Sequence, residues 1–467
     1  MEKLRIGDCK IMKYYNSKRP IRSIEEEEDR LSSLPDALLT DILSRLSLDS
    51  AAATSVLSHR WRRLWTDVTC VDLKVYNRSK STAKISYILR QLTCWKLRHF
   101  GLTLEEDFHS PVIRVSETTS WFREVCSRNV ENISVNADYY VSFPLPAFLF
   151  NSQSLVTLTL RGLLELPKIK DLCVNLPNLN KLTLDQLDKF PLCLETLIKS
   201  SSLLEHLDLV FDLDLSSHVV NIIASNLKSL SISNLSMLNN TRKTRVYIDA
   251  PKLAKLKIQD WSSIYYFLQN PSILVKACIQ LENDGGYDGL ELDGEQDYGA
   301  LSGPRKEYIC QMTKFVGGLS SVSKLELKLE KHLEVDLWLL DDKMEQRRWC
   351  APDFIPDCLV SKLETIHISG LKGIDDDLRL LAYILSNAIV LKKLLVDFST
   401  VDGAYVENER DKAYAVWKEC QLCRSLLNLP RSSSTCEVVV SGRLVAASGN
   451  AVQGEFLTCQ MYLGKYT

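Results

Sequence analysis

The chain lacks the long apolar segments that membrane insertion and secretion require. No apolar run in its 467 residues approaches the ~18–20 residues needed for a membrane-spanning helix. The first twenty residues also lack the compact apolar core of a signal peptide. We therefore expect no membrane partner and an intracellular protein, located in the nucleus and/or the cytoplasm.

An excess of positive charge is also missing. The 57 Lys and Arg residues are balanced by 59 Asp and Glu residues, which gives a formal net charge of −2. Proteins that depend on phosphate contacts usually concentrate positive charge, so we expect no nucleic-acid partner. An acidic run at Glu25–Asp29 is interpreted as a solvated linker, and residues 1–28 are expected to be disordered.

The sequence shows little sign of a metal-binding site. The 14 cysteines are scattered, and they would stay reduced inside a cell. One C-x-x-C pair, Cys420 and Cys423, has no second close pair to complete a four-ligand zinc site. The acidic segment Asp284–Asp297 does not have the residue spacing of an EF-hand, so we interpret residues 283–300 as a loop.

Sequence signatures of catalysis are absent as well. There is no H-E-x-x-H, no G-x-x-x-x-G-K phosphate loop and no G-x-S-x-G elbow. A Ser/His/Asp triad assembles only in space and leaves no local pattern, but nothing in the sequence points to one. We expect no metal, no cofactor and no catalytic residue, and therefore not an enzyme.

What the chain does contain begins with a short helical segment between Asp29 and Leu73. Leu38, Leu39, Ile42, Leu43 and Leu46 follow the three-and-four spacing of a helix with an apolar face. Ser33 is a candidate cap, and Pro35 fits a first helical turn. Asp49 or Ser50 would cap a second helix with its own apolar stripe, which comprises Val56, Leu57, Trp61, Leu64 and Trp65.

This segment resembles an F-box, the module that connects a protein to a SKP–cullin ubiquitin ligase. The resemblance rests on Leu34-Pro35-Asp36, on ILSRL at Ile42–Leu46 and on LSHRWRRLW at Leu57–Trp65, and we assign it residues 29–75. It implies that the tryptophans are structural and that Ser47–Asp49 departs from the usual family pattern. It also implies a set of contacts with the SKP adaptor at Leu34, Pro35, Leu38, Ile42 and Leu43.

A second pattern, Leu-x-x-Leu-x-Leu, recurs along the middle of the chain. Its central residues are Leu158, Leu182, Leu207, Leu230 and Leu256, at steps of 24, 25, 23 and 26. This period lies in the leucine-rich range of ~20–29 residues. We expect an α/β leucine-rich-repeat solenoid over residues 76–350, with further units centred on residues 100, 133, 277 and 325. Units centred on residues 366 and 394 would continue the array into residues 351–441.

The residues between the leucines would form the inner face of this solenoid. They are small, polar and of mixed charge, and most of them are ordinary solvated positions. As a face they could hold a protein target. The charged candidates for target binding are Lys181, His206, Asp208, Lys255 and Lys257.

The C-terminal part resembles the FBD domain, which often follows an F-box and leucine-rich repeats in plant proteins. The matching features are Pro356–Leu359, the strand Leu363–Ile368, Gly370, the helix Asp375–Asn387 and the strand Leu391–Val396. A last strand is expected within Leu429–Val438. We assign this domain residues 351–441, and residues 442–467 match nothing and are expected to be disordered.

Together these resemblances imply the substrate-recognition subunit of a SKP–cullin–F-box ubiquitin ligase. Its partners would be a SKP adaptor, a cullin held through that adaptor, and an unknown protein target. Two alternatives stay open: an interaction scaffold outside any ligase, and a receptor that senses a small molecule on the inner face of its solenoid.

Overall fold

The computed structural model divides the chain into two compact units, Met1–Trp65 and Thr66–Thr467. The structure describes residues 31, 33–75, 78–104, 114–137, 143–162, 164–167, 173–185, 191–211, 219–234, 244–260, 264–269, 271, 273–284, 315, 319–332, 355–371, 375–398, 417, 420–421, 423–426, 428–443 and 458–463. The expected disorder of residues 1–28 and most of the acidic segment lie outside these residues.

The first unit is helical, as predicted. It contains α1 (Asp36–Leu43), α2 (Leu48–Ala53), the 3₁₀ turn η1 (Thr54–Val56) and α3 (Trp61–Leu64), while the 3₁₀ turn η2 (Trp65–Asp67) spans the division between the units. The core of the first unit consists of apolar side chains that are at most 7% exposed, namely those of Leu39, Leu43, Leu48, Ala51, Trp61 and Leu64.

The helix starts differ from the predicted ones. Pro35 occupies the N-cap position of α1 and makes no side-chain cap hydrogen bond, so the helix itself begins at Asp36. Ser47, rather than Asp49 or Ser50, caps α2, because its side chain accepts a hydrogen bond from the Ser50 N–H. Serine is among the best N-cap residues, and here it lies one residue before the helix.

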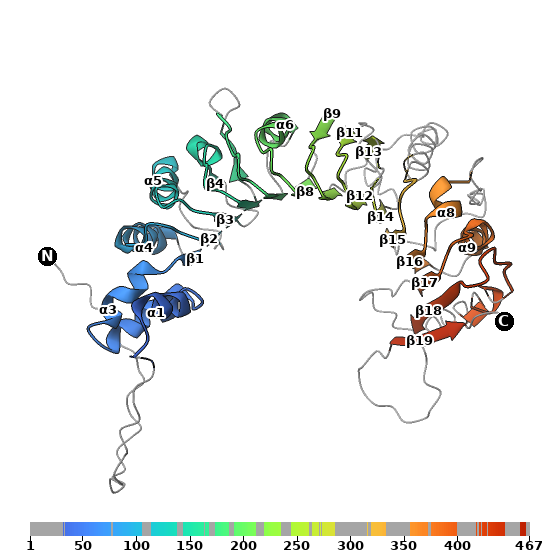
Figure 1. Ribbon diagram of the computed structural model, residues 1–467, viewed down its shortest axis with the longest axis horizontal. Helices are drawn as coiled ribbons and strands as arrows, with labels where there is room; N and C mark the ends of the chain where they lie inside the picture. Colours follow the sequence, from blue (N-terminus) through green and yellow to red (C-terminus); the bar gives the residue numbers. More distant parts are fainter. Residues whose placement is uncertain are drawn as a thin grey trace, which may run out of the picture. The chain divides into compact units, whose positions relative to one another are not determined.

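In the described part of the second unit, fourteen strands form one sheet. Figure 1 shows these strands following one another side by side. In spatial order the strands are β1 (Cys70–Val75), β2 (His99–Leu104), β3 (Asn132–Ala137), β5 (Thr157–Arg161), β7 (Lys181–Asp185), β8 (His206–Phe211), β10 (Ser229–Asn234), β12 (Lys255–Asp260), β14 (Lys276–Asp284), β15 (Lys324–His332), β16 (Thr365–Leu371), β17 (Lys393–Phe398), β18 (Glu437–Arg443) and β19 (Thr458–Leu463).

Every predicted leucine-rich unit forms one strand of this sheet. The central leucines of neighbouring repeats are register partners, from Leu158 through Leu182, Leu207 and Leu230 to Leu256. Each of these five side chains is at most 2% exposed. The leucines therefore form a buried column that runs across the strands, which is how a repeat that cannot bury its own apolar face becomes stable.

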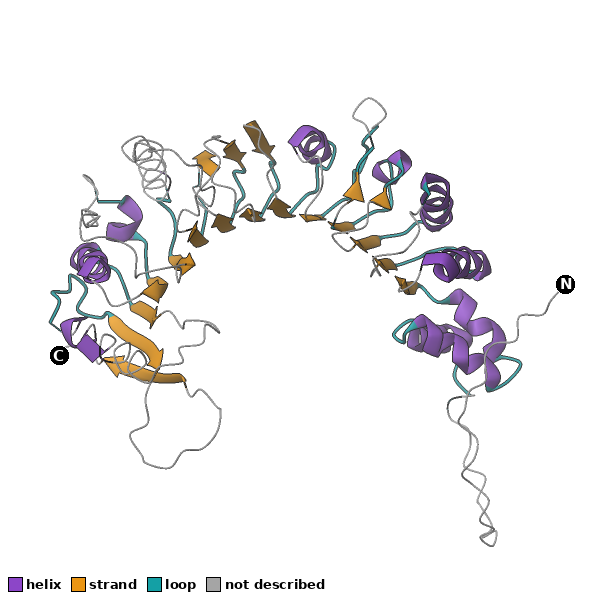
Figure 2. Ribbon diagram, turned by 180° about the vertical axis from the view of Figure 1, so that it is seen from behind, coloured by secondary structure: helices purple, strands orange, loops and turns teal. Residues whose placement is uncertain are grey.

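The outer side of this unit carries mixed elements (Figure 2). Its helices are α4 (Arg78–Gln91), α5 (Val115–Cys126), α6 (Pro191–Lys199), α8 (Asp357–Ser361) and α9 (Asp375–Asn387), with the 3₁₀ turn η3 (Ala147–Phe150). Short parallel strands replace helices elsewhere: β9 (Val219–Ile223), β11 (Thr244–Asp249) and β13 (Ile264–Gln269) form one sheet, and β4 (Phe143–Pro144) and β6 (Leu164–Glu165) another.

Three segments differ from the predicted organisation. β1 lies within residues assigned to the F-box but begins the sheet of the second unit. The last strand of the C-terminal domain, β18, starts only at Glu437, near the end of the predicted segment. β19 lies in the tail that was expected to be disordered and pairs antiparallel with β18, whereas every other pair in the sheet is parallel.

Two glycines in this unit adopt backbone angles that other residues rarely reach. Gly162 has φ of 91°, and an added Cβ would lie 1.7 Å from the Ala137 carbonyl oxygen. Gly370 has φ of 85° and lies where the register of β16 shifts against β17. The glycine that helped to identify the C-terminal domain is therefore required by a bulge in the strand.

Shared backbone carbonyls fix the register of successive strands. The Glu205 carbonyl accepts the N–H groups of Lys228 and Ser229 at 2.8 and 3.0 Å, and the Lys228 carbonyl accepts those of Ala254 and Lys255 at 2.9 and 3.0 Å. The pattern continues along the sheet, for example from Val275 to Ser323 and Lys324. Each repeat thus holds the next at a fixed position, so that equivalent side chains line up in rows.

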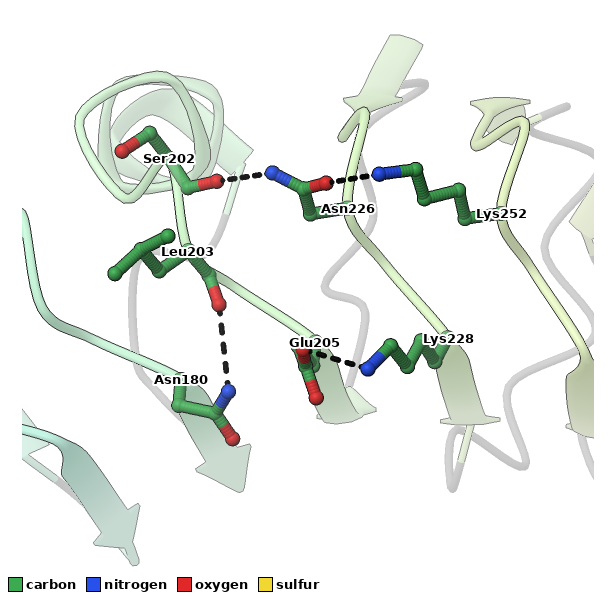
Figure 3. Close-up of polar contacts among 7 residues, drawn as sticks. All are labelled: Asn180, Ser202, Leu203, Glu205, Asn226, Lys228 and Lys252. Atoms are coloured by element: carbon green, nitrogen blue, oxygen red, sulfur yellow. Dashed lines mark hydrogen bonds and ion pairs between the residues drawn. The ribbon is translucent and has the colours of Figure 1, made fainter.

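Side-chain amides add a second set of contacts between the turns that precede the strands (Figure 3). Asn226 donates to the Ser202 carbonyl at 2.8 Å, and Lys252 donates to the Asn226 side-chain oxygen at 2.7 Å. Asn180 contacts the Leu203 carbonyl at 3.5 Å in the same way. The two asparagine side chains thus provide hydrogen-bond donors for backbone carbonyls that lie in the turn before a strand.

A buried polar pair ties the ends of β10 and β12 together. Asn234 and Asp260 are both 0% exposed, and the Asn234 amide donates to Asp260 Oδ1 at 2.9 Å. The other Asp260 oxygen accepts the Ile264 N–H at 3.2 Å, where β13 begins. Because burial of a carboxylate is costly unless it is hydrogen-bonded, the pair links the two sheets only while both partners are present.

We expect Asp260→Ala to lower the free energy of unfolding of the full chain by about 2–3 kcal/mol, because it leaves the Asn234 amide and the Ile264 N–H buried without this acceptor. Urea titration measures this change. The control is Asp249→Ala on β11, a half-buried carboxylate, which should cost no more than ~0.5 kcal/mol. Equal effects of the two substitutions would contradict a structural role for the buried pair.

A second polar pair links β16 to β17. His367 Nε2 lies 2.5 Å from Asp397 Oδ2, and both side chains are about one-third exposed. The hydrogen bond from His367 holds the pKa of Asp397 below its ordinary value, and the same bond raises the pKa of His367. The stabilisation is therefore complete only above the ordinary carboxylate pKa of ~4 and below the ordinary imidazole pKa of ~6.5.

We expect the melting temperature of His367→Gln to fall furthest below that of the wild type near pH 5. The difference should shrink as the pH rises through the raised pKa of His367, because the histidine then loses its proton. Differential scanning fluorimetry between pH 5 and pH 8 measures it, with His206→Gln on β8 as control. A difference that is independent of pH would contradict this role of the pair.

Candidate functional site

The first helix of the N-terminal unit is apolar on two sides. Leu39 and Leu43 point into the core, at 0% and 1% exposed, whereas Leu38 and Ile42 are 53% and 42% exposed. Leu38 and Ile42 are four residues apart, so they lie on one face of α1. Pro35, just before the helix, is exposed as well.

The structure therefore corrects one of the five predicted adaptor contacts. Leu43 belongs to the core and is not available at the surface of this unit. Leu34 is half-buried, and Pro35, Leu38 and Ile42 are exposed as a contact surface requires. Spacing alone could not separate Leu43 from its neighbours, because Leu38, Leu39, Ile42 and Leu43 together follow the same helical period.

Further apolar side chains of this unit are exposed, and the sequence analysis did not propose them as contacts. Val56 and Leu57 were assigned to an apolar stripe, but they are 85% and 65% exposed. Leu46 and Leu31 are 45% and 56% exposed. Exposed leucines are unremarkable singly, but this many in a unit of three short helices indicate an interaction surface.

Arg60 holds the start of this surface in place. Its Nε lies 2.6 Å from Asp36 Oδ1, and its Nη2 donates to the Leu34 carbonyl at 2.5 Å. Arg60 thus connects the beginning of α3 to residues 34–36, which carry the Leu-Pro-Asp motif. An arginine suits this position because its planar group donates to two acceptors at once.

The second candidate surface is the face of the large sheet opposite the helices, here called the open face. It consists of the side chains that alternate with the buried leucines, and Figure 1 shows the helices of this unit on the other side of the strands. All five predicted target-binding residues lie on it: Lys181, Lys255 and Lys257 are exposed, and His206 and Asp208 are half-buried.

The register arranges these residues in rows. Lys181 is the partner of His206, which is the partner of Ser229 and, through it, is aligned with Lys255. Asp208 and Lys257 lie in the adjacent row, two residues further along their strands. Asp208 also accepts a hydrogen bond from Thr183 Oγ1 at 3.4 Å. The five residues share a face but form no single cluster.

Charges on the open face are unevenly distributed. From β1 to β10 it carries three basic and three acidic side chains, namely Lys74, Arg161, Lys181, Asp72, Asp185 and Asp208. At residues 255–259, 276–280 and 324–328 it carries five lysines and one glutamate, namely Lys255, Lys257, Lys276, Lys324, Lys328 and Glu326. The sequence analysis proposed only the first two of these lysines. Further along β14 and β15 the same alternation reaches the acidic residues Glu282, Asp284 and Glu330.

The two cysteines of the C-x-x-C pair lie in different environments. Cys423 is buried and Cys420 exposed, and neither forms a disulfide with another described cysteine. Within the described part of the chain, no group of three or more His, Cys, Asp or Glu side chains could hold a metal ion. Among the helices described, none is long and apolar enough to cross a membrane.

Comparison with known families matches three separate parts of the chain. The F-box domain model matches residues 31–71. The model for the LRR repeats of FBD-associated F-box protein At5g56370 matches residues 118–282, and the FBD model matches residues 352–396. These are the three segments for which the sequence showed a resemblance, in the same order.

Similar proteins of *Arabidopsis thaliana* have the same organisation. F-box/FBD/LRR-repeat protein At5g22660 is 27% identical over 88% of this chain and 96% of its own length. Putative F-box/FBD/LRR-repeat protein At5g44950 is 27% identical over 88% of this chain and 99% of its own length. F-box/FBD/LRR-repeat protein At5g22700 is 31% identical over 54% of this chain and 59% of its own length.

These matches agree with the architecture of both units. A helical F-box unit precedes a mostly parallel leucine-rich sheet, and the strands β16 and β17 with helix α9 fall within or close to the FBD match. F-box proteins are typically parts of SKP–cullin–F-box ubiquitin ligases, and F-box/LRR proteins generally serve there as adaptors without a catalytic site. The chain belongs to the plant F-box/FBD/LRR-repeat proteins.

Proposed function

We propose that this protein is a substrate-recognition subunit of a SKP–cullin–F-box ubiquitin ligase in the plant cell. The exposed side of α1, with Pro35, Leu38 and Ile42, would bind the SKP adaptor and through it a cullin. The open face of the leucine-rich sheet would bind a target protein. The main support for this proposal is that one apolar side of α1 is exposed to solvent, although its other apolar side is already buried in the core.

The protein would not take part in bond chemistry itself. Its contribution is to hold a target beside the ubiquitin-carrying enzyme, which raises the effective concentration of the target's lysines. Neither a metal nor a cofactor is needed for this role. The adaptor surface and the target surface lie on separate compact units, so each can be changed by mutation without altering residues of the other.

A scaffold outside any ligase is the competing function, and cullin recruitment separates the two. Co-purification of the full chain with a plant SKP adaptor and a cullin should recover both partners. Recovery of the adaptor without the cullin would favour the scaffold, and recovery of neither would contradict the proposed function.

We expect the double substitution Leu38→Ser and Ile42→Ser to weaken adaptor binding by about 2–4 kcal/mol, or at least ~30-fold in Kd. The reason is that both side chains would be buried in the complex, where apolar contacts at the centre carry most of the affinity. Surface plasmon resonance with immobilised SKP adaptor measures the change, and the melting temperature should stay within a few degrees of the wild type.

Two matched variants make this test specific. Val219→Ser with Ile223→Ser removes two equally exposed aliphatic side chains from β9 of the second unit, and should not change adaptor binding. Leu39→Ala removes a core side chain of α1 and should destabilise the chain by about 2–5 kcal/mol. Adaptor binding that survives the α1 face variant would refute the proposed surface.

We expect Arg60→Ala to weaken adaptor binding by about threefold to tenfold, although its side chain is polar. Without Arg60, the segment of Leu34 and Pro35 loses the two hydrogen bonds that orient it. Arg62→Ala, two residues further on and exposed, is the control in the same binding assay. If both variants bind equally well, Arg60 does not position this segment.

A further inference from the structure

Three lysines lie side by side on the open face of β12, β14 and β15. Lys255 is the register partner of Lys276, and Lys276 is the register partner of Lys324. All three are exposed, and Lys257 is exposed two residues beyond Lys255 on β12. Since neighbouring strands lie about 4.8 Å apart, the three side chains form one row of positive charge, here called the lysine ladder.

This row contrasts with charged pairs elsewhere in the same unit. One position earlier in the repeats, Lys228 Nζ lies 2.7 Å from Glu205, and Lys392 Nζ lies 2.8 Å from Glu364 (Figure 3 shows the first pair). On the open face Arg161 lies 3.9 Å from Asp185, its register partner. Where charges meet across strands in these repeats, they are therefore usually of opposite sign.

The positive charges of the lysine ladder are only partly neutralised by nearby carboxylates. Glu326 lies 3.6 Å from Lys276 and 3.6 Å from Lys328, so one carboxylate serves two lysines. Lys255, Lys257 and Lys324 form no ion pair with another described residue. Like charges directly opposite each other in a sheet are destabilising, and the ladder therefore weakens the free chain slightly.

The chemistry of this surface favours a protein partner over a nucleic acid. Single-stranded nucleic acids are usually bound by basic grooves that also offer aromatic side chains for stacking. Around the lysine ladder, at residues 255–259, 276–280 and 324–328, the open-face positions carry lysine, glutamine, cysteine and glutamate, with no aromatic residue and no arginine. A nucleic acid carries a charge on every nucleotide and would bring some of these charges close to Glu326. An extended peptide can place its few carboxylates opposite the lysines alone.

We propose that the lysine ladder binds an extended acidic segment of the target protein, with aspartate or glutamate carboxylates paired to Lys255, Lys276 and Lys324. This rests on the proposed function, because it specifies what the open face recognises. Side chains on one side of an extended peptide recur about every 6.6 Å, so two or three alternating carboxylates span the ladder. Lysine donates as a point charge on a flexible stem, so charge rather than a fixed geometry would select the partner.

The test uses the full chain bound to its SKP adaptor and a fluorescent twelve-residue peptide of alternating glutamate and serine. Fluorescence anisotropy at low salt measures binding, with a glutamine–serine peptide as neutral probe. The ladder variant is Lys255→Gln with Lys276→Gln and Lys324→Gln. The matched control variant is Lys199→Gln with Lys228→Gln and Lys392→Gln, which removes the same charge from positions of the same unit outside the open face.

We expect the acidic peptide to bind the wild type, and the ladder variant to bind it about tenfold more weakly, with less than a threefold loss in the control variant. Binding should weaken as salt increases. The ladder variant should melt at the same temperature as the wild type or higher, because it relieves repulsion among the lysines. That result separates lost binding from unfolding.

The proposal would be overturned if both variants lost equal affinity for the acidic peptide, or if the acidic and neutral peptides bound equally well. It would also be overturned if a single-stranded RNA of equal charge bound to the ladder more tightly than the acidic peptide. Ladder-dependent binding of a phosphoserine peptide but not of the acidic peptide would overturn it as well. Co-purification of the SKP adaptor is scored separately for each variant. Loss of the adaptor with retained peptide binding would refute the ligase role, whereas the reverse would refute only the ladder.

Discussion

The whole arrangement of the second unit depends on the register between successive strands. Shared backbone carbonyls, such as those of Glu205 and Lys228, each accept two N–H groups of the next repeat. The buried leucine column sets the same register from the core side, because a slip by one residue would turn every leucine to solvent. The positions of open-face side chains, including the lysine ladder, follow from this register and need no contacts of their own.

The architecture could be predicted largely from the sequence, because the leucine period reports directly on the column that stabilises it. Even the unit centred on residue 277, where alanine replaces the central leucine, forms a strand, β14. The charge pattern of the open face was harder to see. Lys276 and Lys324 belong to strands whose central residues are 48 positions apart in sequence, so only the register of β14 with β15 reveals that they are neighbours.

The adaptor surface shows a different limit of sequence reasoning. Helix α1 has apolar residues on two sides, and a periodic pattern does not tell which side faces the core. The choice is made by tertiary packing, which buries Leu39 and Leu43 among Leu48, Trp61 and Leu64 and leaves Leu38 and Ile42 outside. The sequence analysis gave Arg60 no role of its own, because its bond to the Leu34 carbonyl joins residues 26 positions apart.

The two proposed surfaces would use opposite kinds of interaction. An apolar face binds by excluding water and is nearly insensitive to salt, whereas a row of exposed lysines is screened within about 10 Å at 0.1 M salt. A solenoid can carry such a row because its stability is spread over many repeat interfaces, so local repulsion on three strands costs little of the total. In the proposed function, adaptor binding and target selection could therefore be adjusted separately. Substitutions on the open face would change which target is held, while the apolar side of α1 would keep its partner.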